Sequence, residues 1–230
     1  MRLDQFVSQS TGMSRKDARR CIRNQHIIVS GHVITKAATP INAADEVLLD
    51  FELITLPGPI YIMLNKPAGV VSATEDASQP TVMDLIDHPH RHTLHMAGRL
   101  DKDTTGLLLL TNDGDWSHRI TSPRHHVAKT YLATLAEPLG SDAAAQLRQG
   151  VMLNGEKQPT LPAKVTVLAT APQPQARLTI YEGKYHQVKR MFAAVGNRVV
   201  ALHREQVGRW TLPENLETGE WCLLETPESQ

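Results

Sequence analysis

The hydrophobic and polar positions of this chain divide it into two regions, and the first has a helical pattern. Apolar residues within 3–7 follow the i, i+3, i+4 spacing of a short helix. Ser14–Asp17 is a Ser-x-x-Asp capping pattern, which predicts the start of a second helix. Ile27–Val29 and Val33–Ile34 flank a Ser-Gly-His turn and predict a small hairpin.

The second region alternates strand-like runs with short helices. It follows a linker predicted over Leu53–Pro59, where two prolines and a glycine interrupt regular structure. Strands are predicted over 60–64, 107–110, 130–135, 163–168 and 177–181, and helices over 141–148 and 186–195. The strand at 107–110 is four leucines between glycines, which predicts burial on both faces before an Asp-Gly turn at Asp113. The chain is therefore predicted to be an α+β protein with domains over 1–56 and 57–230.

Composition and charge add a possible partner to this picture. The chain has 230 residues, 41% hydrophobic and 21% charged, which is ordinary for a soluble globular protein. Its net charge is zero, yet residues 1–36 hold seven Lys or Arg against two Asp.

We expect a cytoplasmic protein without membrane association. The sequence has two cysteines without a CxxC motif, no secretory leader and no membrane-length apolar run.

The basic charge gathers on the second predicted helix. Arg15, Arg19 and Arg23 lie at i, i+4 and i+8, with Lys16 and Arg20 in a second row. Like charges at this spacing repel, so an anionic partner explains why the helix keeps them. Nucleic acid is one interpretation, and a solvated helix surface is the other.

A candidate catalytic carboxylate lies just before the leucine strand. Arg99 and Asp101 are two positions apart in Gly98–Gly106, so in extended chain they point to the same side and share one wall of a cleft. An adjacent cation keeps such a carboxylate ionised. The alternative is a surface loop that contains a structural Arg–Asp pair.

Two further polar runs supply cations. The run Glu182–Phe192 follows an apolar strand and opens a helix, and Lys189 lies one turn into it, where its ammonium can meet Asp101 across a cleft. The run Ser122–Tyr131 adds an aromatic ring that can stack on a base. The candidates for contacts with a phosphate backbone are Arg124, Lys129, Lys184, Lys189 and Arg190.

Several other chemistries lack their motifs. The dense histidines of His88–His95 come without HExxH or paired CxxC, so structural or RNA-facing histidines are favoured over a metal site. Neither a Gly-x-Ser-x-Gly elbow nor a Walker or Gly-x-Gly-x-x-Gly loop is present. The remaining inventory fits an enzyme that acts on a base within folded RNA without an added cofactor.

Four motifs in order resemble bacterial pseudouridine synthases of the RsuA type, the small-subunit rRNA branch. They are Leu64–Gly69, Gly98–Leu108, Lys129–Tyr131 and Glu182–Met191. Residues 1–50 resemble the S4 RNA-binding domain, so the resemblance covers nearly the whole chain. It implies a catalytic domain with a mixed, largely antiparallel sheet and a central RNA cleft.

The resemblance also implies a reaction and roles for single residues. Uridine becomes its carbon-linked isomer, a redox-neutral exchange that needs no cofactor or metal. The implied roles are Asp101 as the catalytic carboxylate, Tyr131 packed on the target uracil, Lys189 paired with Asp101, Leu178 and Ile180 as an apolar floor, and Arg99 in base flipping. For Asp101, covalent attack on C1′ and proton removal at C2′ both remain open.

The implied substrate is one uridine of 16S rRNA, of the uridine-516 type. The enzyme is expected to act as a monomer on this RNA or on the partly assembled small subunit. The same chemistry on 23S rRNA and a non-catalytic assembly factor with an S4 domain remain alternatives. A hydrolase or metalloenzyme is a more distant one.

Overall fold

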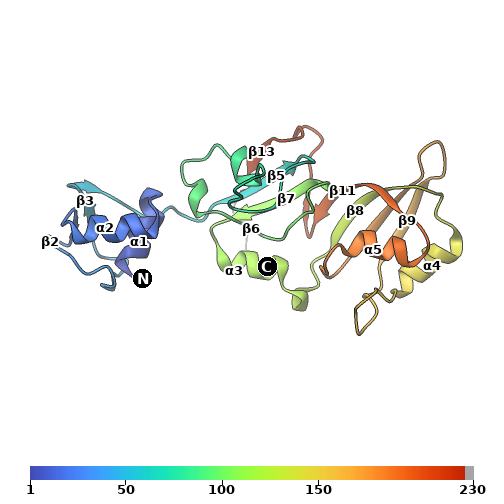
Figure 1. Cartoon of the computed structure of the whole chain (residues 1–230), viewed down its shortest axis with the longest axis horizontal. Coiled ribbons are helices and arrows are strands. Elements are labelled where there is room, and N and C mark those ends of the chain that lie inside the picture. The colour runs from blue at the N-terminus through green and yellow to red at the C-terminus, as the bar shows by residue number, and fades with distance from the viewer. Residues whose placement is uncertain (226–230) are drawn as a thin grey trace. The chain divides into compact units, whose positions relative to one another are not determined.

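The structure, a computed structural model, describes residues 1–225, and these form two compact units. The first unit comprises Met1–Ile60 together with Asp87–Leu94. The second comprises Tyr61–Ile86 and residues 95–225 (Figure 1).

The first unit pairs two helices with a small antiparallel sheet in the order β2-β1-β3-β4. Its elements are α1 (Leu3–Thr11), α2 (Arg15–Arg23), β1 (Ile27–Val29), β2 (His32–Val33), β3 (Val47–Leu49), β4 (Glu52–Leu53) and the 3₁₀ helix η2 (Arg91–Thr93). The Ser14 hydroxyl accepts a hydrogen bond from the Asp17 amide at 3.1 Å, so the predicted cap is present. The predicted hairpin forms as the antiparallel pair β1–β2.

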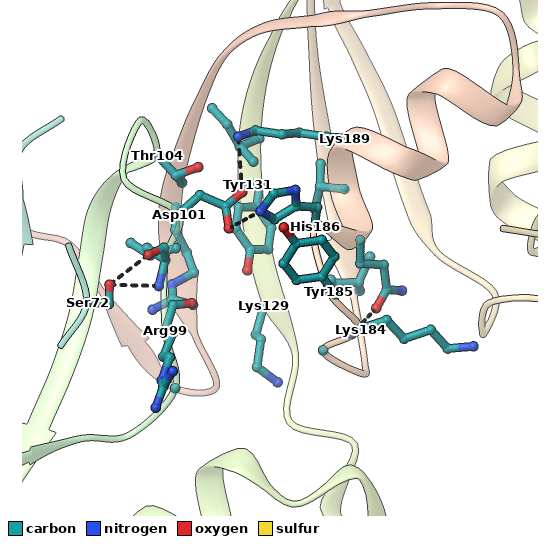
Figure 2. A pocket seen from close by; sticks show the side chains of 18 of the residues that line it. Ser72, Arg99, Asp101, Thr104, Lys129, Tyr131, Lys184, Tyr185, His186 and Lys189 are labelled. Atoms are coloured by element: carbon teal, nitrogen blue, oxygen red, sulfur yellow. Dashed lines mark hydrogen bonds and ion pairs between the residues drawn. The ribbon is translucent and has the colours of Figure 1, made fainter. Parts of the chain in front are cut away.

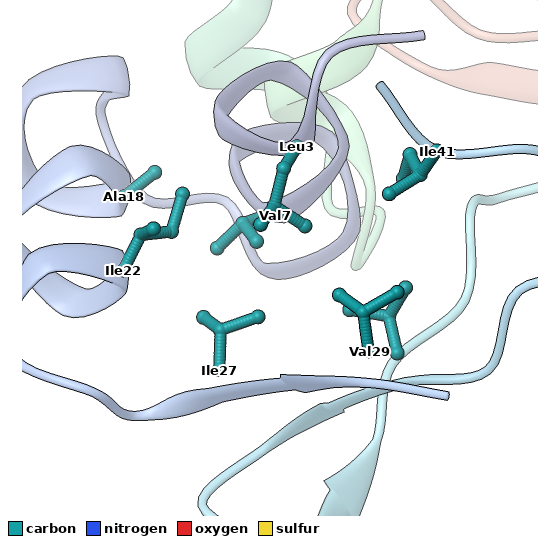
Figure 3. Packing of buried hydrophobic residues seen from close by; sticks show 8 residues of the cluster. Leu3, Val7, Ala18, Ile22, Ile27, Val29 and Ile41 are labelled. Atoms are coloured by element: carbon teal, nitrogen blue, oxygen red, sulfur yellow. The ribbon is translucent and has the colours of Figure 1, made fainter. Parts of the chain in front are cut away.

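The apolar positions of both helices meet the sheet in one core. Leu3 and Val7 from α1 pack with Ala18 and Ile22 from α2 and with Ile27 from β1, all fully buried (Figure 3). This burial is what the i, i+3, i+4 spacing requires, because it places the apolar side chains on one face of each helix.

The second unit is built on a nine-stranded mixed sheet, with a main order β13-β5-β7-β11-β8-β10-β9. Its strands are β5 (Tyr61–Lys66), β6 (His95–Met96), β7 (Thr105–Thr111), β8 (Lys129–Leu135), β9 (Lys164–Ala169), β10 (Gln175–Ile180), β11 (Val199–Val207), β12 (Trp210–Thr211) and β13 (Trp221–Leu223). The strands β7 and β11 run parallel, and the other pairings of these strands are antiparallel. The largely antiparallel sheet expected from the resemblance is therefore confirmed.

Three helices pack on this sheet: α3 (Gly114–Thr121) against β7, α4 (Ser141–Gln149) against β9 and α5 (Gln187–Ala194) against β11 (Figure 1). Short 3₁₀ helices form at η1 (Val82–Leu85) and η3 (Pro123–His125). The predicted Asp-Gly turn at Asp113 is wrong, since this carboxylate caps α3 by accepting from the Trp116 amide at 3.0 Å. Within residues 1–225, no helix has the length and apolar character needed to cross a membrane.

The leucine strand lies at the centre of the second unit. All four leucines of 107–110 are fully buried, which confirms the prediction of burial on both faces. Leu107 and Leu109 share a core with Tyr61 and Trp116, whose rings meet edge to face at 4.9 Å. The strand thus gives the loop that precedes it a rigid base.

Candidate active site

A cavity of about 540 Å³ opens in the second unit, in the size range of small-molecule sites. Loop 98–104, strands β8 and β11, and the start of α5 supply its lining (Figure 2). Asp101, Tyr131 and Lys189 all line it, so three segments far apart in the sequence meet at one place.

Asp101 supplies a carboxylate to the cavity lining. Its Oδ2 lies 3.0 Å from Lys189 Nζ, and its Oδ1 lies 3.4 Å from His186 Nε2 (Figure 2). The side chain is 27% exposed, so it remains open to a ligand. Its carbonyl accepts from the Thr104 amide at 3.1 Å, and this turn holds the carboxylate just before β7.

The cation that pairs with Asp101 is Lys189 and not Arg99, the neighbour in sequence that was one of the two candidates. Arg99 lines the cavity but forms no ion pair with Asp101 or with any other carboxylate of residues 1–225. Both residues nevertheless line the same cavity, as the shared-wall prediction requires, so the ion pair between Arg99 and Asp101 is the part that the structure does not show.

Lys189 lies between two carboxylates. Its Nζ also donates to Asp103 Oδ1 at 2.6 Å. Burial lowers the pKa of Lys189, but the hydrogen bonds and charges of Asp103 and Asp101 outweigh this effect and raise it above its usual value. The ammonium is therefore charged at neutral pH, and it lowers the pKa of Asp103.

His186 lies directly before α5 with a left-handed backbone, at φ 47°. Such a conformation is uncommon for a residue with a Cβ and is often kept at functional sites. The exposed ring of Tyr185 stacks on the His186 imidazole with centroids 3.8 Å apart. The pair forms one side of the cavity opposite the loop that carries Asp101 (Figure 2).

Tyr131 and apolar residues form the inner part of the cavity. Tyr131 is 7% exposed, and on the sheet this residue pairs with Leu178 of β10 and Arg204 of β11. Ile180 lines the cavity as expected, whereas Leu178 is buried in the sheet and is not part of the lining. Leu202 supplies a further apolar surface that the sequence did not indicate.

The predicted cations of this unit have different surroundings. Lys129 lines the cavity, and its pKa is lowered by burial and by the nearby Arg204. Lys184 also lines it, but its ammonium pairs with Glu156 at 3.2 Å. Arg190 pairs with the same Glu156 at 3.4 Å and lies outside the lining, as does the exposed Arg124.

The basic face of α2 contacts a carboxylate from the neighbouring helix α1. Asp4 of α1 is fully buried, and its carboxylate pairs with Arg15 at 3.0 Å and with Arg19 at 2.9 Å. Arg2 adds a third pair at 3.0 Å. Two of the five cations of this helix are therefore already paired with a carboxylate that α1 supplies.

The remaining cations of α2 are more available. Arg20 pairs with Asp17 at 2.8 Å on the exposed surface. Lys16 and Arg23 are exposed and make no ion pair with the residues that the structure describes. The binding of RNA by this helix stays a prediction, in which Lys16 and Arg23 are the cations free of a structural role.

Comparisons with known proteins agree with this arrangement. The profile of the RNA pseudouridylate synthase family matches residues 60–194, and that of the S4 domain matches residues 1–47. The chain belongs to the pseudouridine synthase family. It is an enzyme of this class, and its architecture joins an S4 domain to a pseudouridine synthase domain.

Similar pseudouridine synthases extend over almost the full chain. Ribosomal small subunit pseudouridine synthase A of Salmonella typhimurium is 54% identical, covering 99% of this chain and 98% of its own length. The protein of that name from Escherichia coli K12 is 52% identical over the same shares. A crystal structure of a pseudouridylate synthase matches with a TM-score of 0.70 at 47% identity, covering 98% of this chain and 96% of the other.

Proposed function

We propose that this pseudouridine synthase modifies one uridine of 16S rRNA, the uridine-516 type of site, with Asp101 as its catalytic residue. The observation that carries the substrate is the full-length similarity to proteins named ribosomal small subunit pseudouridine synthase A. Support for Asp101 comes from its place in the cavity, where a cation and an imidazole orient a partly exposed carboxylate.

The proposed reaction is an isomerisation, so its atoms balance without a co-reactant. The bond between C1′ and uracil N1 breaks, and a bond between C1′ and C5 forms. The C5 proton leaves, and N1 gains a proton. The Asp101 carboxylate serves as nucleophile at C1′ or as base at C2′. Deuterium at C2′ separates these routes, since only proton removal at C2′ gives a primary isotope effect.

The target nucleotide must leave its stack to reach Asp101. Such flipping costs a few kcal/mol, which stacking and cationic contacts in the pocket offset. The cavity offers the Tyr131 ring and Ile180 to the base and the exposed Arg99 to the position that the base vacates. We propose that a monomer performs this step in the cytoplasm, on free 16S rRNA or on the partly assembled small subunit.

The decisive experiment measures single-turnover pseudouridine formation on 16S and on 23S rRNA. RNA labelled with tritium at uracil C5 releases the label when the C5 proton leaves. The native protein is compared with Asp101→Asn, and Asp142→Asn on the exposed start of α4 is the matched control.

We expect product on 16S rRNA alone, loss of product with Asp101→Asn and unchanged product with the control. Product on 23S rRNA alone would overturn the substrate and keep the chemistry. Bound RNA without product from the native protein would favour an assembly factor.

A further inference from the structure

Two buried cations lie beneath the cavity without a carboxylate partner. Lys66 at the end of β5 is 0% exposed, and Arg204 in β11 is 2% exposed. Neither forms an ion pair with the carboxylates of residues 1–225. Burying an unpaired charge is costly, and apolar residues of similar volume are often as stable or more stable. Their presence therefore needs a reason other than stability.

The Lys66 ammonium binds the loop that follows Asp101. Its Nζ donates to Thr104 O at 3.0 Å, to Lys102 O at 3.3 Å and to Pro67 O at 2.9 Å. Three carbonyls satisfy its three donors. Two of these carbonyls belong to the turn that begins at Asp101, so the ammonium fixes that turn from its C-terminal side.

The Arg204 guanidinium binds the chain on both sides of the same turn. Its Nε donates to Leu107 O at 2.7 Å, and its Nη1 donates to Arg99 O at 3.4 Å. Its Nη2 is buried and has no hydrogen-bond partner among the described residues. The side chain also lines the cavity, with its Cζ 6.0 Å from the centre of the Tyr131 ring.

We propose that Lys66 and Arg204 are positioning residues, which together hold the Asp101 carboxylate in place by binding the carbonyls of Arg99, Lys102, Thr104 and Leu107. These carbonyls flank Asp101 from two residues before it to six residues after it. A cation in a dry site forms stronger hydrogen bonds to carbonyls than a neutral donor does. Buried cations usually pair with carboxylates. For these two side chains, the backbone carbonyls around Asp101 take that place.

The two cations differ in how they respond to pH. Lys66 is faced by the charges of Asp103, Asp101 and Arg204, and burial is the main cause that lowers its pKa to about 8. Arginine stays protonated in proteins. Mild alkali therefore removes the Lys66 charge, and with it one of the three carbonyl contacts, while the Arg204 contacts persist.

This inference rests on the proposal that Asp101 is catalytic. The test compares native protein with Lys66→Met and Arg204→Lys, with Lys164→Met on the exposed face of β9 as matched control. Tritium release under single turnover gives the rate constant, filter binding gives the RNA Kd, and thermal melting reports folding. The rates are measured across about pH 7 to 9, where only the Lys66 charge of this pair titrates.

We expect Lys66→Met to lower the rate constant by about 100-fold while Kd changes less than about 3-fold, because a displaced catalytic group costs rate rather than binding. The native rate should fall above about pH 8, and this fall should be absent in Lys66→Met. Arg204→Lys should lower the rate and keep the fall.

Three results would overturn the proposal. Lys66→Met could react as fast as the native protein, it could lose RNA binding as much as it loses rate, or its rate could still fall in mild alkali. If Lys66→Met does not fold, a native rate that is constant across this pH range also overturns it. A failure of the proposed function looks different, because the native protein then gives no product on 16S rRNA.

Discussion

The Lys189 ammonium lies 3.0 Å from Asp101 Oδ2, which joins the first turn of α5 to the loop before β7. Burial of this pair is partial, since each side chain is 27% exposed. A partly buried ion pair of this kind fixes the direction of the carboxylate while leaving part of it open to the cavity.

Removing this ammonium should slow the reaction more than it weakens RNA binding. Lys189→Met is expected to lower the single-turnover rate by about 100-fold, because the carboxylate loses the contact that orients it. Lys189→Arg should recover much of the rate, since a guanidinium also pairs with a carboxylate. Tritium release at saturating enzyme measures both. Equal rates for Lys189→Met and native protein would contradict this role.

Gly106 should tolerate no side chain. Its φ is +100°, and an added Cβ would overlap the carbonyl oxygen of Arg204, where β7 and β11 run side by side. Gly106→Ala is expected to destabilise the second unit by about 3 kcal/mol or more, because both backbone strain and steric overlap oppose it. Thermal melting measures the loss.

The matched control for that substitution is Gly114→Ala at the start of α3. Nothing lies within 4 Å of its added Cβ, and its φ is not in the left-handed range. Alanine has a higher helix propensity than glycine and meets no overlap at this position, so this variant should melt at the same or a higher temperature. A similar loss in both variants would mean that the close approach of β7 and β11 is not the cause.

The cations of α2 should separate into two classes. Arg15→Ala with Arg19→Ala is expected to destabilise the first unit by about 1–2 kcal/mol, since it removes two pairs from buried Asp4 but the arginines are half exposed. Lys16→Ala with Arg23→Ala should leave melting unchanged. The same double variant should reduce the salt dependence of RNA binding. The slope of log Kd against log salt concentration should fall by about 0.7–0.9 for each lost phosphate contact. An unchanged slope in the second pair would exclude these cations from RNA binding.

Stability of the first unit should fall in acid through Asp4. Hydrogen bonds from Arg2, Arg19 and Arg15 outweigh burial and hold the pKa of Asp4 well below its usual value of 3.8. Because the folded state lowers this pKa, its contribution is complete above pH 3.8 and is lost as the pH falls below that value. Melting curves between about pH 2.5 and 6 measure it. Asp4→Asn should flatten the curve, whereas Glu52→Gln on exposed β4 should not.

The sequence alone determined the elements that depend on residues close together in the chain. The leucine strand, the Ser14 cap and the apolar faces of α1 and α2 depend on residues a few positions apart, so periodicity reveals them. The sequence also determined the family, because ordered motifs around Asp101, Tyr131 and Lys189 carry the resemblance. It did not indicate α3, which is short and largely polar, or β11, where polar His203 to Gln206 interrupt the apolar pattern.

Only the tertiary structure decided which charges meet. The sequence offered both Arg99 and Lys189 as cations beside Asp101, and the fold selects Lys189, whose ammonium lies 3.0 Å from the carboxylate. Asp4 reaches the arginines of α2 through the packing of two helices. The sequence pattern gave no sign that Lys66 and Arg204 are buried, but the sheet encloses both beneath the Asp101 loop. Local pattern reports which side chains share a face, whereas ion pairs and buried donors depend on strands and helices that join only when the chain folds.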